Sequence, residues 1–413
     1  MTIASTDQGA PAGTWLLVVD DPVVRPHAPS SGSAQPTGRI LGLSVLLRLA
    51  LTAQAAGARA IALAETLDRN EARRQLADRR LRIPVIDEAE RPSLIEFRIA
   101  TPSVRVPANT VIHRATLVAL AKSANGGEVK LSSGAPAGAG GLYGFEPIFV
   151  DGADAARKAQ RALLRSLRKP QDGWVSTHLN RKISLFLTRW LVSTPLSPNQ
   201  LSVGILGVGL LGAWLASRGT YASMLLGAAL FQMQSVLDGC DGEMSRLTFR
   251  GSRAGEWLDT VGDDVTNYAF FAGAAWGLHA ASGRSFYLAL GAVMVLSGVV
   301  GSALEYRYLV RIGSGDLLKY PLGIGKAPGG DGAQPKSTLS RALDAISPLF
   351  KRDTFVFLTL VGAALGWLGP FLALASLGSI GVLAAVVSAE LRMNKERLAS
   401  RRSAQVDPVL PRD

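Results

Sequence analysis

The segment Gln200–Ser217, QLSVGILGVGLLGAWLAS, contains no charged residue. Similar uncharged and largely apolar segments follow at Gly219–Leu237, Val265–Gly283, Ser285–Leu304 and Thr354–Ala389. A helix of ~20 apolar residues is long enough to span the ~30 Å hydrocarbon core of a bilayer. The last segment is roughly twice that length, and Gly-Trp-Leu-Gly-Pro at 366–370 interrupts it, which predicts a tight helical hairpin. We therefore predict a domain of six transmembrane helices.

The composition of the chain agrees with a membrane protein. Apolar residues make up 48% of the 413 residues and charged residues 18%, which excludes a disordered chain, since such chains combine low hydrophobicity with high charge. The single cysteine, Cys240, excludes an intrachain disulfide and multi-cysteine metal sites. The net charge of +12 suits anionic phosphates, a nucleic acid or an anionic membrane surface.

The basic residues are distributed unevenly among the predicted loops. The loops after the first, third and fifth helices offer only Arg218 and Arg284. The other two loops and the tail carry Arg246, Arg250, Arg253, Arg307, Arg311, Lys319, Lys326, Lys336, Arg341, Lys351, Arg352, Arg392, Lys395, Arg397, Arg401 and Arg402. The positive-inside rule places these basic segments and both termini in the cytoplasm. Because topology accounts for the net charge, we expect a multi-pass inner-membrane protein without a nucleic-acid partner, and Met1–Trp15 does not resemble a cleaved signal peptide.

The segment Trp174–Leu191 precedes the first predicted span. Its apolar residues fall on one helical stripe, namely Val175, Leu179, Ile183, Phe186, Leu187, Trp190 and Leu191. Such an amphipathic pattern with two tryptophans and basic residues is typical of a helix that lies in the bilayer interface. The alternative, a short seventh span, is disfavoured by Arg181, Lys182 and Arg189.

Acidic residues concentrate where the second predicted span ends and the third begins. The sequence reads Asp238-Gly-Cys-Asp241-Gly242-Glu-Met-Ser245-Arg246, then eight residues, then Gly255-Glu-Trp-Leu-Asp259-Thr-Val-Gly-Asp263. Residues three or four positions apart share one face of a helix, so the two helix ends present four carboxylates. Acids in a membrane require partners, and oxygen-only ligands suit Mg²⁺ or Mn²⁺. The spacing therefore predicts a metal site.

These residues fit the pattern D-x₂-D-G-x₂-A-R-x₈-G-x₃-D-x₃-D, and residues 170–395 are similar to the CDP-alcohol phosphotransferase (CDP-alcohol phosphatidyltransferase) family. The one departure is Ser245, where the family usually has alanine. The resemblance implies a transferase in which an acceptor hydroxyl attacks the β-phosphorus of a CDP-linked donor and displaces CMP. It also implies two Mg²⁺ or Mn²⁺ ions and a homodimer.

The resemblance further implies a role for each matching residue. Asp238, Asp241, Asp259 and Asp263 would hold the metals, and Asp263 would also be the catalytic base. Arg246 would steady the diphosphate, while Gly242 and Gly255 would admit the nucleotide. Glu243, Glu256 and Asp264 fall outside the spacing, so no role is expected for them.

The substrates are less constrained by the sequence. The donor is expected to be a CDP-diacylglycerol-like lipid or a CDP-polyol, and the acceptor an inositol phosphate or related polyol, in phospholipid or polar-lipid biosynthesis. The acceptor phosphate requires basic residues, for which the candidates are Arg250, Arg253, Arg307, Arg311, Lys351 and Arg352. The alternatives are a di-inositol-phosphate phosphate synthase that uses soluble CDP-inositol, or a non-catalytic scaffold or transporter. Four acids kept at these spacings argue against the non-catalytic alternative.

The N-terminal part reads as alternating α/β structure with a parallel sheet. We predict a strand at Trp15–Val19, a helix at Leu43–Ala56 ended by Gly57, and a strand at Ala60–Ala64. This layout is similar to the nucleotidyltransferase-like domain of fused inositol-phosphate cytidylyltransferase/di-inositol-phosphate phosphate synthase enzymes. Their glycine-rich phosphate loop is replaced by Asp20–Pro29, whose prolines remove backbone donors. We therefore expect a degenerate domain without cytidylyltransferase activity.

The expected organisation follows from these segments. Residues 1–168 form the cytoplasmic nucleotidyltransferase-like domain, and residues 169–198 form a linker with the interfacial helix. Residues 199–392 form the membrane domain, and residues 393–413 form a basic cytoplasmic tail. Ser132–Gly141, rich in glycine, alanine and serine, is expected to be a surface loop.

Overall fold

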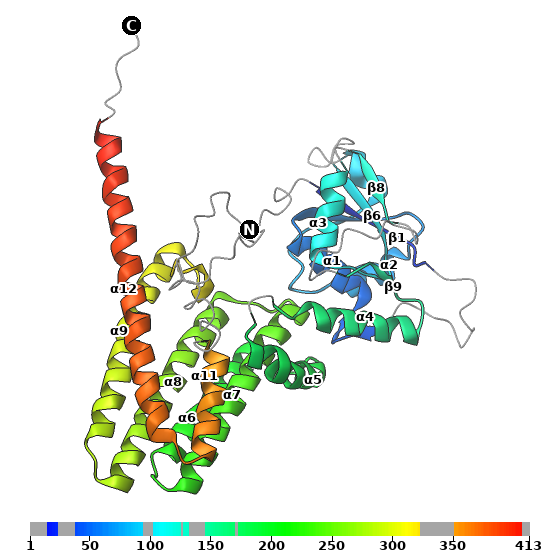
Figure 1. The fold of residues 1–413 in the computed structure, drawn as a ribbon. Helices are drawn as coiled ribbons and strands as arrows, with labels where there is room; N and C mark the ends of the chain where they lie inside the picture. Colours follow the sequence, from blue (N-terminus) through cyan, green and yellow to red (C-terminus); the bar gives the residue numbers. More distant parts are fainter. Residues whose placement is uncertain are drawn as a thin grey trace.

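A computed structural model describes residues 15–23, 38–93, 102–124, 127–131, 145–169, 172–322 and 351–406. The chain forms an α/β domain followed by a helical part, and the helix α4 (Ala153–Ser166) lies between them (Figure 1). The loop expected at Ser132–Gly141 and most of Asp20–Pro29 lie outside the described residues.

The α/β domain is built on a five-stranded parallel sheet with the order β5-β4-β1-β6-β8. The strands are β1 (Trp15–Asp20), β4 (Ala58–Leu63), β5 (Val85–Asp87), β6 (Ser103–Pro107) and β8 (Glu128–Lys130). The predicted parallel sheet and its first two long strands are therefore confirmed. The helix α1 (Val45–Ala55) begins two residues later than predicted, because Ser44 caps it by accepting a hydrogen bond from the Leu47 backbone N–H.

The remaining elements of this domain lie outside the five-stranded sheet. They are the helices α2 (Arg69–Leu76) and α3 (Arg114–Ser123), the 3-10 helix η1 (Glu88–Ser93), and two short antiparallel ladders, β2 (Arg39–Ile40) with β3 (Leu43–Ser44) and β7 (Thr110–Val111) with β9 (Ile148–Phe149). Trp15, Leu17 and Val19 of β1 form one apolar core with residues of α1, α2 and α3. Burial of this face fixes the sheet against its helices.

Ion pairs between side chains lie at the carboxyl end of β1. In an open parallel sheet, ligands bind outside the carboxyl ends of the strands where the strand order reverses, which here is between β1 and β6. Arg105 of β6 forms ion pairs with Asp20, Glu88 and Glu128 beside that point. The loop after β1 is held by Asn109, whose side chain accepts from the Val23 backbone N–H at 3.0 Å.

The helical part begins with the π-helical turn η3 (Ser176–Asn180) and the helix α5 (Arg181–Leu191). The longer helices are α6 (Pro198–Ala216), α7 (Tyr221–Thr248), α8 (Arg253–Ser282), α9 (Phe286–Ile312), α11 (Arg352–Ala364) and α12 (Leu368–Val406), with the 3-10 helix η4 (Leu317–Lys319) after α9. The predicted break at 366–370 separates α11 from α12. The short connections α6–α7, α8–α9 and α11–α12 lie at the end away from the α/β domain (Figure 1).

Three helices among the described residues are long and apolar enough to cross a membrane. These are Pro198–Ala216, Phe286–Ile312 and the first part of α12, Leu368–Leu398. The six spans predicted from the sequence are thus supported only in part. The reason is physical, since α7 and α8 carry the motif acids together with polar residues such as Gln232, Gln234 and Asn267, and the described part of α11 is only 13 residues long.

A buried arginine joins the two parts of the molecule. Arg48 of α1 donates to the backbone carbonyl of Leu247 in α7 at 2.9 Å and to those of Ile40 and Leu41. Burial, and secondarily the charge of Arg80, lowers the pKa of Arg48 to about 10, so the side chain is still charged at neutral pH. Around it, Ile40, Leu41 and Val45 share an apolar cluster with Met244 and Leu247.

Replacing Arg48 should weaken this junction. In Arg48→Met, three buried carbonyl groups lose a donor, and each orphaned group costs ~1–3 kcal/mol. We expect thermal unfolding of the detergent-solubilised protein, followed by circular dichroism, to begin at a clearly lower temperature. Lys122→Met, at an exposed position of α3, is the control and should unfold like the unsubstituted protein. Equal midpoints for the two variants would contradict the structural role of Arg48.

Candidate active site

Three of the four motif acids line one cavity. Asp241 of α7 and Asp259 and Asp263 of α8 border a cavity of about 460 Å³. The same cavity is lined by Gly242, Arg246 and Gly255. The structure thus brings together the motif residues that the sequence predicts, with Asp238 one helical turn before Asp241 on α7.

Asp238 is linked to this group through an arginine. The Arg352 guanidinium, at the start of α11, lies 2.9 Å from Asp263 Oδ1 and 3.5 Å from Asp238 Oδ2. It also donates to Gln234 Oε1 at 2.9 Å. Arg352 was predicted to bind an acceptor phosphate. In the structure it instead pairs with two acids, Asp238 on α7 and Asp263 on α8.

Asp241 is held by the first long helix of the bundle. Ser202 of α6 donates its hydroxyl hydrogen to Asp241 Oδ2, and the Gly242 backbone N–H donates to Oδ1. Only 6% of Asp241 is exposed, so its orientation is fixed by these donors. The contact of Ser202 with Asp241 was not predicted, because nothing in the motif spacing points to a residue 39 positions earlier.

The two motif glycines occupy different surroundings. A side chain at Gly255 would come within 2.8 Å of Asn199 Oδ1, so this glycine permits close approach of α6 to α8. At Gly242 the nearest group is the Arg246 guanidinium, 3.4 Å from where a Cβ would stand. Both glycines were predicted to leave space for a nucleotide, and the free space beside the backbone is larger at Gly242 than at Gly255.

The cavity is lined by only some of the predicted cations. Arg246 and Arg250 border it, whereas Arg253, Arg307, Arg311 and Lys351 are exposed and do not. Lys169, which was not predicted, also lines the cavity. Burial, and secondarily the charge of Arg246, lowers the pKa of Lys169. Lys169 belongs to the linker before α5, so its contribution depends on how the linker folds back onto α7 and could not be found from motif spacing.

Glu243, for which no role was expected, anchors α5 to α7. It is fully buried, and its carboxylate accepts from Arg181 Nη1 at 2.7 Å, Ser184 Oγ at 2.8 Å and Thr188 Oγ1 at 2.8 Å. Arg181 in turn pairs with Asp172 at 2.9 Å. Burial alone would raise the pKa of Asp172, but the hydrogen bonds from Arg181 and from the Lys169 backbone outweigh it and lower that pKa.

The chemistry of the acids suits a divalent cation. Carboxylate oxygens are preferred ligands of Mg²⁺ and Mn²⁺, and Asp259 interacts electrostatically with both Asp238 and Asp241. Within the described ranges, however, no three acidic, histidine or cysteine side chains converge closely enough to hold an ion. In this arrangement, Arg352 supplies the positive charge between Asp238 and Asp263.

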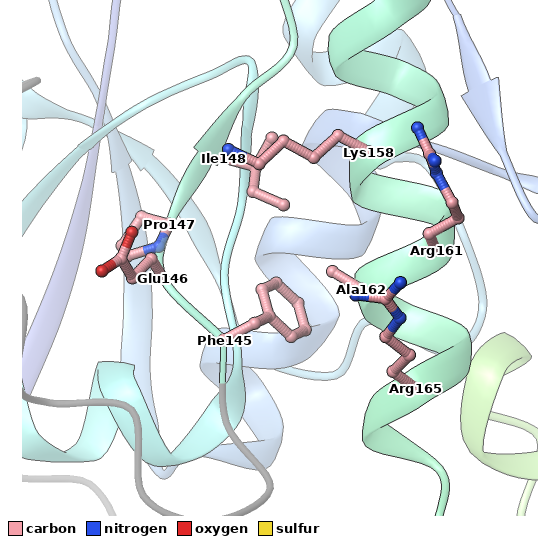
Figure 2. Close-up of a pocket in the computed structure, with 8 residues that line it drawn as sticks. All are labelled: Phe145, Glu146, Pro147, Ile148, Lys158, Arg161, Ala162 and Arg165. Carbon is pink, nitrogen blue, oxygen red and sulfur yellow. The ribbon is translucent and has the colours of Figure 1, made fainter.

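Another cavity, of about 380 Å³, lies in the α/β domain and contains no motif residue. Figure 2 shows the ring of Phe145 pointing toward α4, which contributes Lys158, Arg161 and Arg165. This cavity is lined from β9, the residues before it and α4 only. It is therefore separate from the cavity that contains the acids.

Residues 196–327 match the model of the CDP-alcohol phosphatidyltransferase family. This range contains the four acids together with Gly242, Arg246 and Gly255. A protein from Aquifex aeolicus and one from Rubrobacter xylanophilus are similar to this chain, and each is named bifunctional IPC transferase and DIPP synthase. The first is 36% identical over 135 residues and the second 35% identical over 211 residues.

The match is partial on both sides. It covers 32% of this chain and 30% of the Aquifex protein, and 50% of this chain and 44% of the Rubrobacter protein. The aligned part therefore spans less than half the length of either relative. Residues 196–327 are therefore similar to CDP-alcohol phosphatidyltransferases, over about a third of this chain.

Removing the charge of Glu243 should destabilise the protein. Glu243→Gln leaves the buried Arg181 with Asp172 alone, and breaking a buried ion pair costs ~3–5 kcal/mol. We expect a lower midpoint of thermal unfolding in detergent, measured by differential scanning fluorimetry. Glu256→Gln is the matched control, since Glu256 is exposed and accepts one long hydrogen bond, of 3.4 Å, from Gly315. A Glu243→Gln midpoint as high as the control's would show that the anchor is dispensable.

Proposed function

We propose that this chain is a membrane transferase that displaces CMP from a CDP-linked donor by attack of an acceptor hydroxyl. The observation that carries the proposal is the cavity in which Asp241, Asp259 and Asp263 meet Arg246 inside the matched family domain. A lining that contains both carboxylates and a guanidinium suits a diphosphate that is bound together with cations. The product would be a phosphodiester in phospholipid or polar-lipid biosynthesis.

The proposed roles follow the positions of the side chains. Asp238, Asp241, Asp259 and Asp263 would hold Mg²⁺ or Mn²⁺, two ions by family resemblance, which would neutralise the diphosphate charge. Asp263 would accept the proton of the acceptor hydroxyl as its oxygen bonds to the β-phosphorus. The bond from that phosphorus to the CMP oxygen breaks, and CMP leaves with its electron pair. Arg246 and Lys169, which line the cavity, would orient the phosphates.

Arg352 connects the acids with the acceptor in this proposal. It now pairs with Asp238 and Asp263, and it was predicted as a ligand for the acceptor phosphate. An incoming phosphate would draw the guanidinium away from the acids and leave them able to bind cations. Arg253, Arg307 and Lys351 would act earlier, as exposed positive charges that attract an inositol phosphate or related polyol phosphate.

A lipid-linked donor is favoured by a further cavity in the helical part. It has a volume of about 350 Å³ and lies between α8, α9, α11 and α12. Apolar side chains such as Met294, Phe355 and Phe371 line most of it, with Asp264 also at its wall. An acyl chain suits this lining better than a polyol does. Transfer from soluble CDP-inositol, as a di-inositol-phosphate phosphate synthase, is the second candidate, because the relatives carry DIPP synthase in their names.

We further propose that the protein crosses the inner membrane with α6, α7, α8, α9, α11 and α12, and that both termini are cytoplasmic. The exposed apolar side chains of Ile183, Phe186 and Trp190 on α5 support contact with the bilayer interface. The four proposed units, 1–168, 169–198, 199–392 and 393–413, follow this topology, although α12 continues as a helix through the last boundary to Val406. A homodimer is proposed from the family resemblance alone.

The acids can be tested by neutral substitution. Asp238→Asn and Asp241→Asn should abolish CMP release, measured across CDP-lipid and CDP-polyol donors with polyol phosphate acceptors, because charge is lost while shape is kept. EDTA should stop the reaction, and Mg²⁺ or Mn²⁺ should restore it. Glu390→Gln on α12 is the control, because Glu390 lines neither of these cavities and Tyr320 can still donate to the amide oxygen. If Asp238→Asn keeps turnover within about tenfold, ~1.4 kcal/mol of barrier, the assignment is wrong.

The α/β domain should lack cytidylyltransferase activity. Its phosphate loop is missing, and Arg105 already pairs with Asp20, Glu88 and Glu128 at the edge where a nucleotide would bind. Given CTP and inositol phosphate, the full-length protein should form no CDP-inositol and release no pyrophosphate. Pyrophosphate release above that of a protein-free blank would make the enzyme bifunctional and overturn the degenerate interpretation.

A further inference from the structure

A cavity with several basic side chains lies where the α/β domain meets the helical part. A cavity of about 520 Å³, which we name the junction cavity, is formed by β2 and the loop before β3, the residue Arg80, the helix α4 and the ends of α5 and α7. Five arginines border it: Arg39, Arg80, Arg157, Arg189 and Arg250. Gln160 and Ser193 add neutral hydrogen-bonding groups.

The positive charge of the junction cavity is only partly balanced. Arg80 pairs with Asp78 and Arg157 with Asp154. In the part of the chain that the structure describes, no carboxylate forms an ion pair with Arg39, Arg189 or Arg250. All three side chains are exposed. Like charges gathered around a concave surface repel one another unless an anion lies between them.

The position of the junction cavity relates it to the catalytic cavity. Arg250 lines both, so the two cavities adjoin each other at the end of α7. The arginines also come from both parts of the chain, with Arg39 and Arg80 from the α/β domain and Arg189 and Arg250 from the helical part. An anion bound here would therefore hold the two parts together beside the proposed reaction site.

We propose that the junction cavity is a second anion site, which binds a phosphate-bearing ligand. Guanidinium groups give paired hydrogen bonds to phosphate oxygens, and the cavity is large enough for a phosphorylated sugar or a diphosphate. The phosphate can belong to a soluble metabolite or to the headgroup of an anionic lipid, because Arg189 is next to the exposed Trp190 on α5. The binding itself does not depend on the proposed transferase activity.

A single cysteine can report on this cavity. The one native cysteine, Cys240, is fully buried, so Ser193→Cys places the only accessible thiol at the cavity wall. We would measure its rate of maleimide labelling in full-length protein, in neutral detergent with and without inorganic pyrophosphate. A parallel arm compares nanodiscs of phosphatidylglycerol with nanodiscs of phosphatidylcholine. Ser123→Cys, at an exposed position of α3, is the control for any direct effect of pyrophosphate or lipid on the maleimide reaction.

A matched pair of double variants tests the arginines. In the Ser193→Cys background, Arg39→Ala with Arg189→Ala removes two cavity charges. Arg79→Ala with Lys182→Ala removes two exposed charges from the same regions of the chain but outside the cavity. We expect the first pair to raise the pyrophosphate concentration for half-protection by about tenfold or more, since charge-assisted hydrogen bonds are lost, and the second to change it less than about twofold.

The outcomes separate the sources of the phosphate. Protection by pyrophosphate that only the cavity variant weakens supports a soluble ligand. Protection confined to phosphatidylglycerol nanodiscs, and weakened only by the cavity variant, supports a lipid headgroup. Absence of protection in both arms, or equal loss in both double variants, would overturn the proposal. The Asp241→Asn variant should be protected normally, so failure of the transferase proposal would leave this result unchanged.

Discussion

The repulsion among acids on α7 and α8 is the constraint to which the rest of the helical part responds. Asp238, Asp241 and Asp259 interact electrostatically with one another, and Asp241 is almost fully buried. Such a group is stable only where cations and hydrogen-bond donors face it. These groups come from three other segments of the chain. Ser202 on α6 donates to Asp241, Arg352 on α11 pairs with Asp263, and Lys169 in the linker lines the same cavity.

This balance makes separate segments depend on one another. Asp172 accepts a hydrogen bond from the Lys169 backbone N–H and pairs with Arg181 on α5, and Arg181 also pairs with Glu243. These contacts tie the linker that carries Lys169 to α5 and α7. Glu243 itself lies two residues from Asp241, so the contact that anchors α5 also fixes the rotation of α7 about its axis. A residue outside the family spacing thereby sets the direction in which the spaced acids point.

Sequence reasoning succeeded where the information is local. Helical periodicity places Asp238 with Asp241 and Asp259 with Asp263, and alternating apolar segments indicate the strands and the helix of the α/β domain. It failed where the partner is far along the chain, as for Ser202 with Asp241 and Arg181 with Glu243. It also gave Arg352 only a topological and phosphate-binding role, because loop charges do not reveal which cation turns toward the acids.

The α/β domain has a structural use that does not require its own chemistry. The last turn of α7 ends with carbonyl groups that lack intrahelical donors, and Arg48 and Arg80 donate to those of Leu247 and Thr248. A cation at the carboxyl end of a helix also stabilises the helix dipole. The domain therefore caps the helix that carries Asp238 and Asp241. This capping role depends on the sheet and its core, because they hold α1, which carries Arg48, in place.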